Sequence, residues 1–411
     1  MEMCPDLFAA EPIPESAMED IKALMQSGDL FRYTSGTSSP VAQLERDFAD
    51  LMGTPYALAV NSCSSGIFLT IKAMGLKPGS RILMPAFTFA AVPSAVVHAD
   101  CQPVLVECGA DFRIDMADFG RKLDRTISAV LISHMRGHTS DMDCIMDLCA
   151  ARGVPVIEDA AHSLGTTWAG RKIGTLGKVG CFSLQSYKLL NAGEGGLLIT
   201  SDEDIIARAI IMSGAYEHNW QKHGTLSPRI ALWQNKLPLY NMRMNNLSAV
   251  VARCQLAELP RRVEYGRRNH DHVAAKLEAS PWFSVPDPLD AEVRAPDSIQ
   301  FRLRGFDSHA AVQGFISRAA ERGLDVQIFG LSRNNARAFW NWEFIGPQGD
   351  LPKTRDMLMR TCDVRLPARL EIADLDIIAD ILLSSAEDIQ GKVPQGPAFT
   401  TSKKKASASK I

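Results

Sequence analysis

Residues 154–165 read VPVIEDAAHSLG and residues 181–196 read CFSLQSYKLLNAGEGG, and these two stretches decide the fold. The first is an apolar run that ends in the acids Glu158 and Asp159. The second leads from an apolar run to a lone Lys188, a glycine-rich turn and a further apolar run, GLLI. Continuously apolar runs are typical of strands with both faces buried, as in a mostly parallel sheet flanked by helices.

The same texture extends outward on both sides of these stretches. Short apolar runs predict seven strands, at residues 57–60, 81–84, 103–107, 129–133, 154–158, 179–184 and 196–200. Helical stretches fit between them, at 65–74 before Gly75 and at 141–151 before Gly153, and glycine is the usual residue after a helix end. Strands that alternate with helices predict an α/β fold.

The pattern changes after about Met244. Residues 246–259 read as a helix that Pro260 should kink or stop. Residues 298–304 (SIQFRLR) alternate apolar and polar side chains, which predicts a strand with one wet face in an antiparallel sheet. We therefore expect a large domain over 1–250 with an N-terminal arm, a smaller α+β domain over 251–392, and a disordered basic tail over 393–411.

The bulk composition excludes several classes of protein. The 411 residues carry 44 Lys and Arg against 47 Asp and Glu, a net charge of −3, so nothing steers the molecule toward nucleic acid or an anionic membrane. The acidic N-terminus has no signal-peptide pattern, and no apolar run could span a bilayer. Nine cysteines without a CxxC pair favour reduced thiols in a cytoplasm.

Two residues stand where chemistry is expected, and each has a structural alternative. Asp159 ends a buried strand at the carboxyl edge of the sheet, where open α/β sheets bind ligands, but it could simply cap the next helix. Lys188 lies between two core strands, where desolvation would lower the pKa of its amine and make it a nucleophile, but it could also reach out to solvent. The GEGG run does not match a dinucleotide-binding fingerprint, because it precedes a strand.

Two further segments suit a bound anion and a flat ring. Residues 61–66 (NSCSSG) place hydroxyls and free backbone amides at a helix start, a ready anion site, although Ser64 or Ser65 could serve only as a cap. Residues 85–89 (PAFTF) follow a strand, so an aromatic such as Phe89 could cover a ring or belong to the core.

In their order and spacing these segments resemble the DegT/DnrJ/EryC1/StrS family of pyridoxal-phosphate-dependent sugar aminotransferases. The resemblance covers about residues 28–390. It rests on Ser35-Gly36, PAFTF (85–89), DMD (141–143), VIEDAAHSLG (156–165), GRKIGTLGKVGCFS (170–183), residues 188–196 and YNMRMNNL (240–247). It implies the aspartate-aminotransferase-like fold (fold type I), with a mostly parallel seven-stranded sheet and a smaller C-terminal α+β domain.

The resemblance also implies a role for each matching residue. Lys188 would hold pyridoxal 5′-phosphate as a Schiff base and later shuttle a proton, and Asp159 would keep the pyridine nitrogen protonated so that the ring is a better electron sink. Phe89 would stack on the ring and His162 would lie near its phenolic oxygen.

The implied phosphate cradle and the implied assembly complete this site. The cradle would consist of Ser64, Ser183 and the backbone around Ser65. Asn241 matches a residue that the other subunit lends to the phosphate, which implies a homodimer with a shared active site.

The chain departs from the family pattern at three places near the expected substrate. Cys63-Ser64 replaces a glycine-threonine pair, with the hydroxyl kept, and residues 134–138 read HMRGH where an aromatic is usual. Arg136 could grip a carboxylate or phosphate, or form a structural ion pair. His134 is a second tentative substrate residue; its i,i+4 spacing to His138 lacks a third ligand, so no metal site is predicted.

The third departure is a long loop, residues 216–233, that carries Trp220, His223, Arg229 and Trp233. Trp220 and Arg229 are candidates for substrate contact, although the aromatics could equally pack against a partner chain.

The favoured function is transfer of an amino group from glutamate or glutamine to a keto or aldehyde acceptor. The first candidate for this acceptor is a nucleotide-linked keto-sugar. Three alternatives remain open: a non-sugar carboxylated or phosphorylated ketone as acceptor, another reaction of the same cofactor, and a non-catalytic cofactor-binding regulator.

Overall fold

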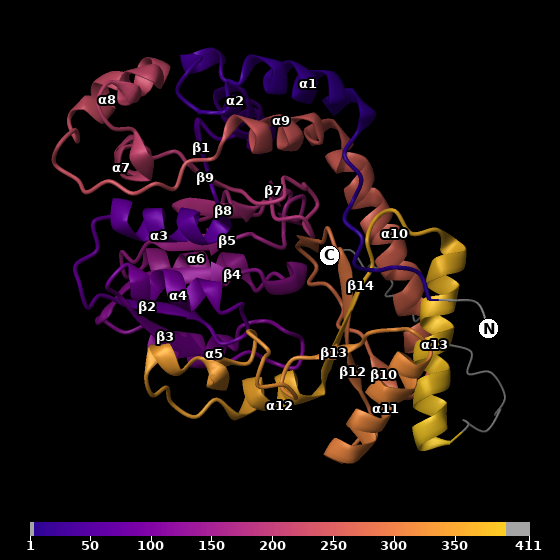
Figure 1. The fold of residues 1–411 in the computed structure, drawn as a ribbon. Helices are drawn as coiled ribbons and strands as arrows, with labels where there is room; N and C mark the ends of the chain where they lie inside the picture. The colour runs from indigo at the N-terminus through magenta and orange to yellow at the C-terminus, as the bar shows by residue number, and fades with distance from the viewer. Residues whose placement is uncertain (1–3, 392–411) are drawn as a thin grey trace, which may run out of the picture.

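The computed structural model describes residues 4–391 and is built around a seven-stranded sheet with the order β1-β9-β8-β5-β4-β2-β3 (Figure 1). The only antiparallel pairs in this sheet are the two that involve β9. The strands are β1 (Tyr56–Val60), β2 (Arg81–Pro85), β3 (Gln102–Val106), β4 (Ile127–Ser133), β5 (Val156–Asp159), β8 (Val179–Ser183) and β9 (Gly196–Thr200). All seven predicted strands and the mostly parallel sheet are confirmed.

Both faces of this sheet are buried under helices. In β2, Ile82 and Met84 enter one hydrophobic core while Leu83, between them, enters another. The first core also takes side chains from α3 (Cys63–Ala73), α4 (Ala91–His98) and α7 (Glu203–Gly214). The second takes them from α2 (Pro40–Met52), α5 (Met116–Lys122), α6 (Met142–Ala150) and α9 (Asn246–Cys254). The continuously apolar strands follow from this double burial, and α3 and α6 confirm the two predicted helices.

The C-terminal third forms a smaller antiparallel sheet with its own core. Its order is β10-β12-β14-β13, with strands β10 (Phe283–Ser284), β12 (Ser298–Leu303), β14 (Thr361–Arg365) and β13 (Gln327–Ile328). It packs on α10 (Leu259–Glu278), α11 (His309–Glu321) and α13 (Ile372–Gln390). Other elements are α1 (Met18–Ser27), α8 (Ser227–Ala231), α12 (Pro352–Arg360) and a small sheet of β11 (Glu292–Val293), β6 (Thr167–Trp168) and β7 (Arg171–Lys172).

The prediction of a wet face on β12 is wrong. Ser298 and Gln300, on its polar side, are 0 % and 1 % exposed. Gln300 donates from its amide nitrogen to Oδ1 of Asp363 at 2.7 Å, and its amide oxygen lies 2.9 Å from Nε2 of His138. The polar face is therefore buried against β14 and the segment after β4. The alternating pattern arises because both faces are covered, one by apolar and one by polar partners.

The chain crosses between the two cores more than once. The helix predicted over 246–259 starts as expected but ends at Cys254, and Pro260 lies in the first turn of α10 instead of stopping the earlier helix. Leu7 packs in the core of the small sheet, whereas Phe329 and Met357 pack in the core of the large one. Figure 1 shows α12 beneath β3 and α5 accordingly. The division at residue 250 remains a prediction, and the predicted tail over 393–411 lies outside the described residues.

Within residues 4–391, none of the helices combines the length and the apolar character that a membrane crossing requires.

Gly196 is the position where the turn after Lys188 depends most on glycine. A Cβ there would lie 2.5 Å from the backbone nitrogen of Cys63 and 2.5 Å from the carbonyl carbon of Ser62. The strand β9 thus touches the start of α3 directly. Gly196→Ala should lower the free energy of unfolding by about 3 kcal/mol through overpacking, measured by urea denaturation. Gly193→Ala is the control: its φ is +75° but nothing lies within 4 Å, so a loss of about 1 kcal/mol is expected. Equal losses would contradict the close-approach argument.

Candidate active site

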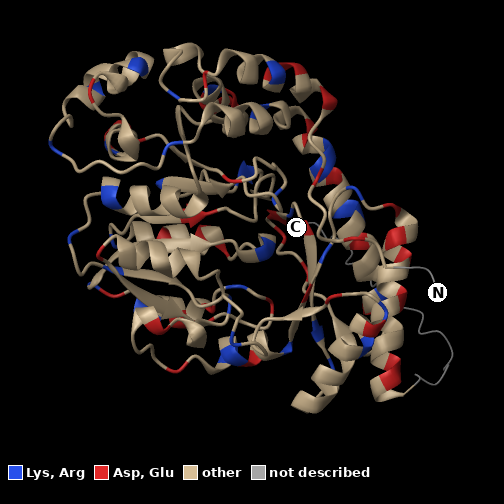
Figure 2. Ribbon diagram, viewed as in Figure 1, with Lys and Arg blue, Asp and Glu red and all other residues tan. Residues whose placement is uncertain are grey.

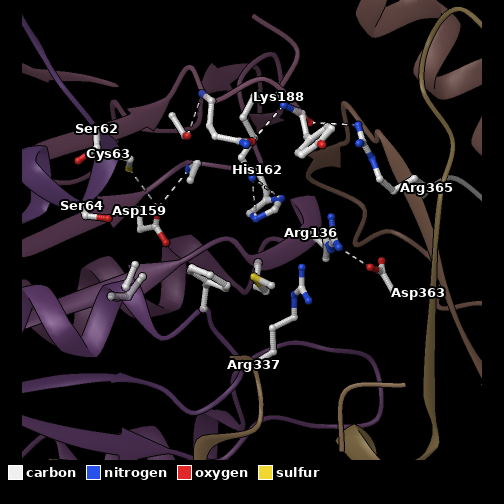
Figure 3. A pocket seen from close by; sticks show the side chains of 18 of the residues that line it. Ser62, Cys63, Ser64, Arg136, Asp159, His162, Lys188, Arg337, Asp363 and Arg365 are labelled. Atoms are coloured by element: carbon white, nitrogen blue, oxygen red, sulfur yellow. Dashed lines mark hydrogen bonds and ion pairs between the residues drawn. The ribbon is translucent and has the colours of Figure 1, made fainter. Parts of the chain in front are cut away.

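A cavity of about 500 Å³ lies at the carboxyl ends of the parallel strands. Asp159 ends β5 and Ser183 ends β8, and both line it. Figure 3 shows Lys188, His162 and Asp159 across the middle of the cavity, with Ser62, Cys63 and Ser64 at one end and Arg136, Arg337 and Arg365 toward the other. The position agrees with the rule that open α/β sheets bind ligands beyond the carboxyl ends of their strands.

Asp159 is a buried carboxylate that three donors hold. Oδ2 accepts a hydrogen bond from the hydroxyl of Ser133 at 2.7 Å, and Ser133 in turn accepts one from Thr88 at 2.9 Å. Oδ1 accepts from the backbone N–H of Ala161 at 3.1 Å and, more weakly, from the thiol of Cys63 at 3.8 Å. These donors fix the position of the carboxylate on the cavity wall. The bond from Ala161 also shows that Asp159 stabilises the turn that follows it. No helix begins there, so the helix-cap alternative is wrong.

Lys188 lies in the turn after β8, with its amine in the cavity. Its Nζ lies 3.0 Å from Nε2 of His162. Burial lowers the pKa of this amine from 10.5 to about 8, although the nearby carboxylate of Asp297 works in the opposite direction. The amine is therefore shielded from bulk water, as the nucleophile reading of this lysine requires. The alternative in which the side chain reaches out to solvent is not what the structure shows.

His162 lies beside Lys188 as a neutral imidazole. Burial, and then the positive charge of Lys188, hold the pKa of His162 well below its ordinary value of 6.5. A neutral ring can accept a hydrogen bond from the lysine amine. The pair can thus share a proton without two cations facing each other.

The start of α3 forms the hydroxyl-rich end of the cavity. The helix cap is Ser62, whose hydroxyl accepts from the backbone N–H of Ser65 at 3.1 Å, and not Ser64 or Ser65 as the sequence suggested. Ser65 turns its own hydroxyl to Asn61 at 2.6 Å, whereas Ser64 is exposed and lines the cavity. Ser64 and the free amides of the first helical turn are hence available to an anion.

Phe89 is the aromatic that faces the cavity from beyond β2. It is 44 % exposed although its neighbours Thr88 and Phe87 are buried. A large apolar ring left open in a cavity is the expected state of a surface that a flat ligand covers.

Besides Ser65, which does not line the cavity, four of the residues proposed from the sequence lie away from it. His134 is fully buried and its Nε2 lies 3.1 Å from a carboxylate oxygen of Glu158, so it cannot touch a substrate. Glu158 also accepts hydrogen bonds from three backbone N–H groups of the loop after β7. Because His134 contacts this same carboxylate, its role is structural. Arg229 pairs with Asp204 at 2.6 Å, and Trp220 packs against the core.

Asn241 is the fourth, and it is exposed outside the cavity of its own chain. Within residues 4–391, no cluster of three or more His, Cys, Asp or Glu side chains could hold a metal ion.

The structure adds several cavity residues that the sequence did not single out, above all Arg337, Asp363 and Arg365. Arg136 lies in the cavity wall and forms an ion pair with Asp363, so the ion-pair alternative for Arg136 is correct. Its backbone is in the left-handed region, with φ of 56°, which turns the side chain toward β14. Arg337, Asp363 and Arg365 carry no local sequence signal, because they are ordinary polar residues of a strand and of a loop.

An α/β fold of this topology, with a buried lysine and a buried carboxylate facing one cavity at the strand ends, defines a protein of the aminotransferase class. The chain belongs to the DegT/DnrJ/EryC1/StrS aminotransferase family, whose sequence model matches residues 13–383. This is a family of pyridoxal-phosphate-dependent enzymes, as the sequence resemblance implied.

Three curated relatives illustrate the similarity. The chain is 32 % identical to 3-amino-5-hydroxybenzoate synthase of Amycolatopsis mediterranei over 328 residues, which are 78 % of this chain and 80 % of that protein. It is 30 % identical to the spore coat polysaccharide biosynthesis protein SpsC of Bacillus subtilis over 60 % of this chain and 62 % of that one. It is 29 % identical to GDP-perosamine synthase of Caulobacter vibrioides over 59 % of this chain and 60 % of that one. The chain therefore spans less than two thirds of the last two relatives.

Solved structures share the fold at lower identity. The aminotransferase TlmJ from Streptoalloteichus hindustanus matches 94 % of this chain and 100 % of its own, with a TM-score of 0.81 and 22 % identity. The putative sugar aminotransferase Spr1654 from Streptococcus pneumoniae, solved in PLP and PMP forms, matches with TM-scores of 0.80 and 0.81 and 18 % identity. These matches confirm the predicted aspartate-aminotransferase-like fold.

Proposed function

We propose that this protein is a pyridoxal-phosphate-dependent aminotransferase that moves an amino group from glutamate or glutamine to a keto or aldehyde acceptor. The first candidate for this acceptor is a nucleotide-linked keto-sugar. The single observation that carries the proposal is the amine of Lys188, shielded in a cavity beside His162, with the carboxylate of Asp159 on the same cavity wall. The family and the relatives named for amino-sugar products support it.

The residues present fit this cofactor. Ser64, Ser183 and the first amides of α3 would hold its phosphate, and Phe89 would cover one face of its ring. Asp159 would accept a hydrogen bond from the protonated ring nitrogen, and Lys188 would hold the aldehyde carbon. When bound, pyridoxal phosphate supplies an electron-withdrawing ring that stabilises negative charge on the carbon beside the amine.

Each protein side chain then has a definite task. Lys188, with a pKa of about 8, is able to take a proton from the substrate carbon and to return it at a neighbouring atom. His162 stays neutral and holds the amine by a hydrogen bond. Asp159, which Ser133 and Ala161 hold by hydrogen bonds, would place its carboxylate opposite the ring nitrogen and so favour a positive charge there.

The remaining partner and location expectations belong to the same proposal. Asn241 is exposed and does not reach its own cavity, which suits a residue that a second copy would use, so we propose a homodimer with a shared active site. The nine cysteines, all within residues 4–391, form no disulfide, which supports a reducing compartment such as the cytoplasm.

Two experiments test the transfer itself. Glutamate or glutamine added to the yellow holoenzyme should convert the cofactor to its amine form, seen as loss of the yellow absorbance. Mass spectrometry should then show which candidate ketones, incubated with that amine form, gain an amino group. A holoenzyme that no amino acid can discharge would overturn the proposal in favour of a non-catalytic cofactor-binding regulator.

The lowered pKa of Lys188 predicts the pH dependence of cofactor capture. Only the unprotonated amine attacks an aldehyde, and a pKa of about 8 rather than 10.5 makes that form common near neutral pH. The rate at which apoprotein takes up pyridoxal phosphate should rise about tenfold per pH unit below pH 8 and level off above it. Stopped-flow absorbance measures this rate; a rise that continues unbroken to pH 10 would show that burial does not depress the pKa of this amine.

A further inference from the structure

Three guanidinium groups gather at the end of the cavity opposite the start of α3, and only one of them has a carboxylate partner. Arg136 pairs with Asp363, whereas Arg337 and Arg365 form no ion pair with any residue of the described chain. Figure 3 shows the guanidinium of Arg337 directed at the group formed by Arg136 and His162. The other cavity acids at the rim, Glu194 and Asp325, are exposed and pair with neither arginine.

The two arginines make contacts within the described chain, but none of these is with a carboxylate. Nη2 of Arg365 donates to the carbonyl oxygen of Tyr187 at 3.3 Å, and the guanidinium carbon of Arg337 lies 5.0 Å from the centre of the Phe329 ring. Nε of Arg337 and Nη1 of Arg365 are buried and, among the residues that the structure describes, have no hydrogen-bond partner. Burial, and then repulsion by Arg136, lower the pKa of Arg337 to about 10, although Asp363 attracts it. Burial lowers the pKa of Arg365 as well, although Asp297 attracts it. Half-buried, partly unpaired cations that repel one another are costly unless an anion joins them.

Resting on the proposed transfer reaction, but with a carboxylated ketone in place of the nucleotide-linked keto-sugar as its acceptor, we propose that the keto acceptor carries a carboxylate and that Arg337 and Arg365 bind it. A planar guanidinium matches a carboxylate with two parallel N–H···O bonds, and two such groups on separate elements fix the orientation of the ligand. Arg365 comes from β14 and Arg337 from the loop after β13, so the subsite forms only when both cores are in place.

The position of the subsite favours a carboxylate near the reacting carbon over the diphosphate of a sugar nucleotide. The guanidinium carbon of Arg337 lies 5.9 Å from the centre of the Phe89 ring, the ring that would cover the cofactor. The positive charges of Arg136, Arg337 and Arg365 all lower the pKa of His162. Nε2 of His162 lies 3.0 Å from the Lys188 amine. An anion held there lies beside the reacting atoms, whereas a diphosphate lies across a sugar ring from the carbonyl. Glutamate would place a carboxylate in the same subsite when it donates.

The test uses a matched pair of ring ketones that differ in charge, 3-oxocyclohexanecarboxylate and its uncharged carboxamide, and in addition a nucleoside-diphosphate 4-keto-6-deoxy-sugar. The enzyme is loaded directly with pyridoxamine phosphate, so that only the acceptor half-reaction is read, as return of the yellow absorbance. Wild type should discharge faster with the carboxylate than with the carboxamide by roughly 10- to 100-fold, the value of charge-assisted hydrogen bonds.

Arg337→Met and Arg365→Met should each reduce the ratio of the carboxylate rate to the carboxamide rate toward one. Arg337→Lys and Arg365→Lys should restore part of this ratio. Arg355→Met is the matched control, because Arg355 stacks on Trp340 at 4.3 Å outside the cavity, and its ratio should equal that of wild type. A ratio near one in wild type, or a ratio that both methionine variants keep, would overturn the proposal. Preference for the sugar nucleotide over the carboxylate would overturn the choice of carboxylate.

A binding measurement separates this inference from the proposed function. Calorimetry of the holoenzyme with cyclohexanecarboxylate and cyclohexanecarboxamide, neither of which can react, should show the same preference and its loss in Arg337→Met. Preferential binding of the carboxylate by a protein that transfers no amino group would support the subsite while the transfer reaction fails. Equal binding of the two ligands by a protein that does transfer amino groups would overturn the carboxylate subsite and leave the proposed transfer reaction standing.

Discussion

Lys188→Ala gives a protein that takes up pyridoxal phosphate without forming the absorbance band of the lysine Schiff base and that has no measurable transfer activity. The alanine removes the amine that holds the aldehyde carbon and the group that carries the proton between atoms of the substrate. Proton transfer by a positioned side chain alone is worth about 10²- to 10⁴-fold in rate, and the loss of covalent attachment adds to this. Absorbance spectra and single-turnover kinetics with glutamate measure both effects.

The matched control for this variant is Lys178→Ala. Lys178 lies at the other end of β8 from the cavity, just before the strand begins, and its side chain is 49 % exposed and paired with Asp202. Its replacement should leave colour and turnover unchanged. A yellow, active Lys188→Ala protein would show that another lysine holds the cofactor, and with it the proposed site would fall.

Asp159→Asn is the second large effect, and it should separate binding from catalysis. The amide keeps the size of the side chain and accepts the hydrogen bond from Ser133, so the cofactor still binds and the protein still turns yellow. The negative charge that keeps the ring nitrogen protonated is gone, and the ring becomes a poorer electron sink. Loss of one preorganised electrostatic partner of this kind costs roughly 10²- to 10³-fold in turnover.

Two comparisons make that result specific. Asp147→Asn changes an exposed aspartate of α6 far from the strand ends, and turnover should not change. Ser133→Ala removes one donor of Asp159 and should lower turnover far less than Asp159→Asn does, because Ala161 and Cys63 still donate to the carboxylate. A fully active Asp159→Asn enzyme would remove the electron-sink argument, whatever the stability of the variant.

The sequence was a reliable guide wherever the signal was local. The strands of the large sheet could be read because both of their faces enter apolar cores, so that Ile82, Leu83 and Met84 are all hydrophobic. Asp159 and Lys188 could be placed at one edge of the sheet because each directly follows a strand that the pattern identified. Phe89 and Ser64, which follow β2 and β1, were found in the same way.

Errors arose where a residue's partner lies far away in the chain. His134 and Arg229 were predicted to contact a substrate, yet in the fold His134 contacts Glu158 and Arg229 pairs with Asp204. The polar side of β12 was read as wet, although Gln300 is buried against His138, more than one hundred residues earlier. No local pattern distinguishes a polar side chain that meets solvent from one that meets another segment.

By itself the sequence determined the α/β architecture, the order of its strands along the chain, and the placing of the lysine and the carboxylate at the edge of one sheet. These features depend on the periodicity of neighbouring residues, and neighbours in the chain remain neighbours in the fold. Only the tertiary structure decided which cations line the cavity. Arg136 meets Asp363 across 227 positions of sequence, and Arg337 reaches the cavity because residues 329–358 return to the large sheet. Side chains from such distant segments meet only through the packing of whole elements, and that packing selects the charge which a substrate encounters.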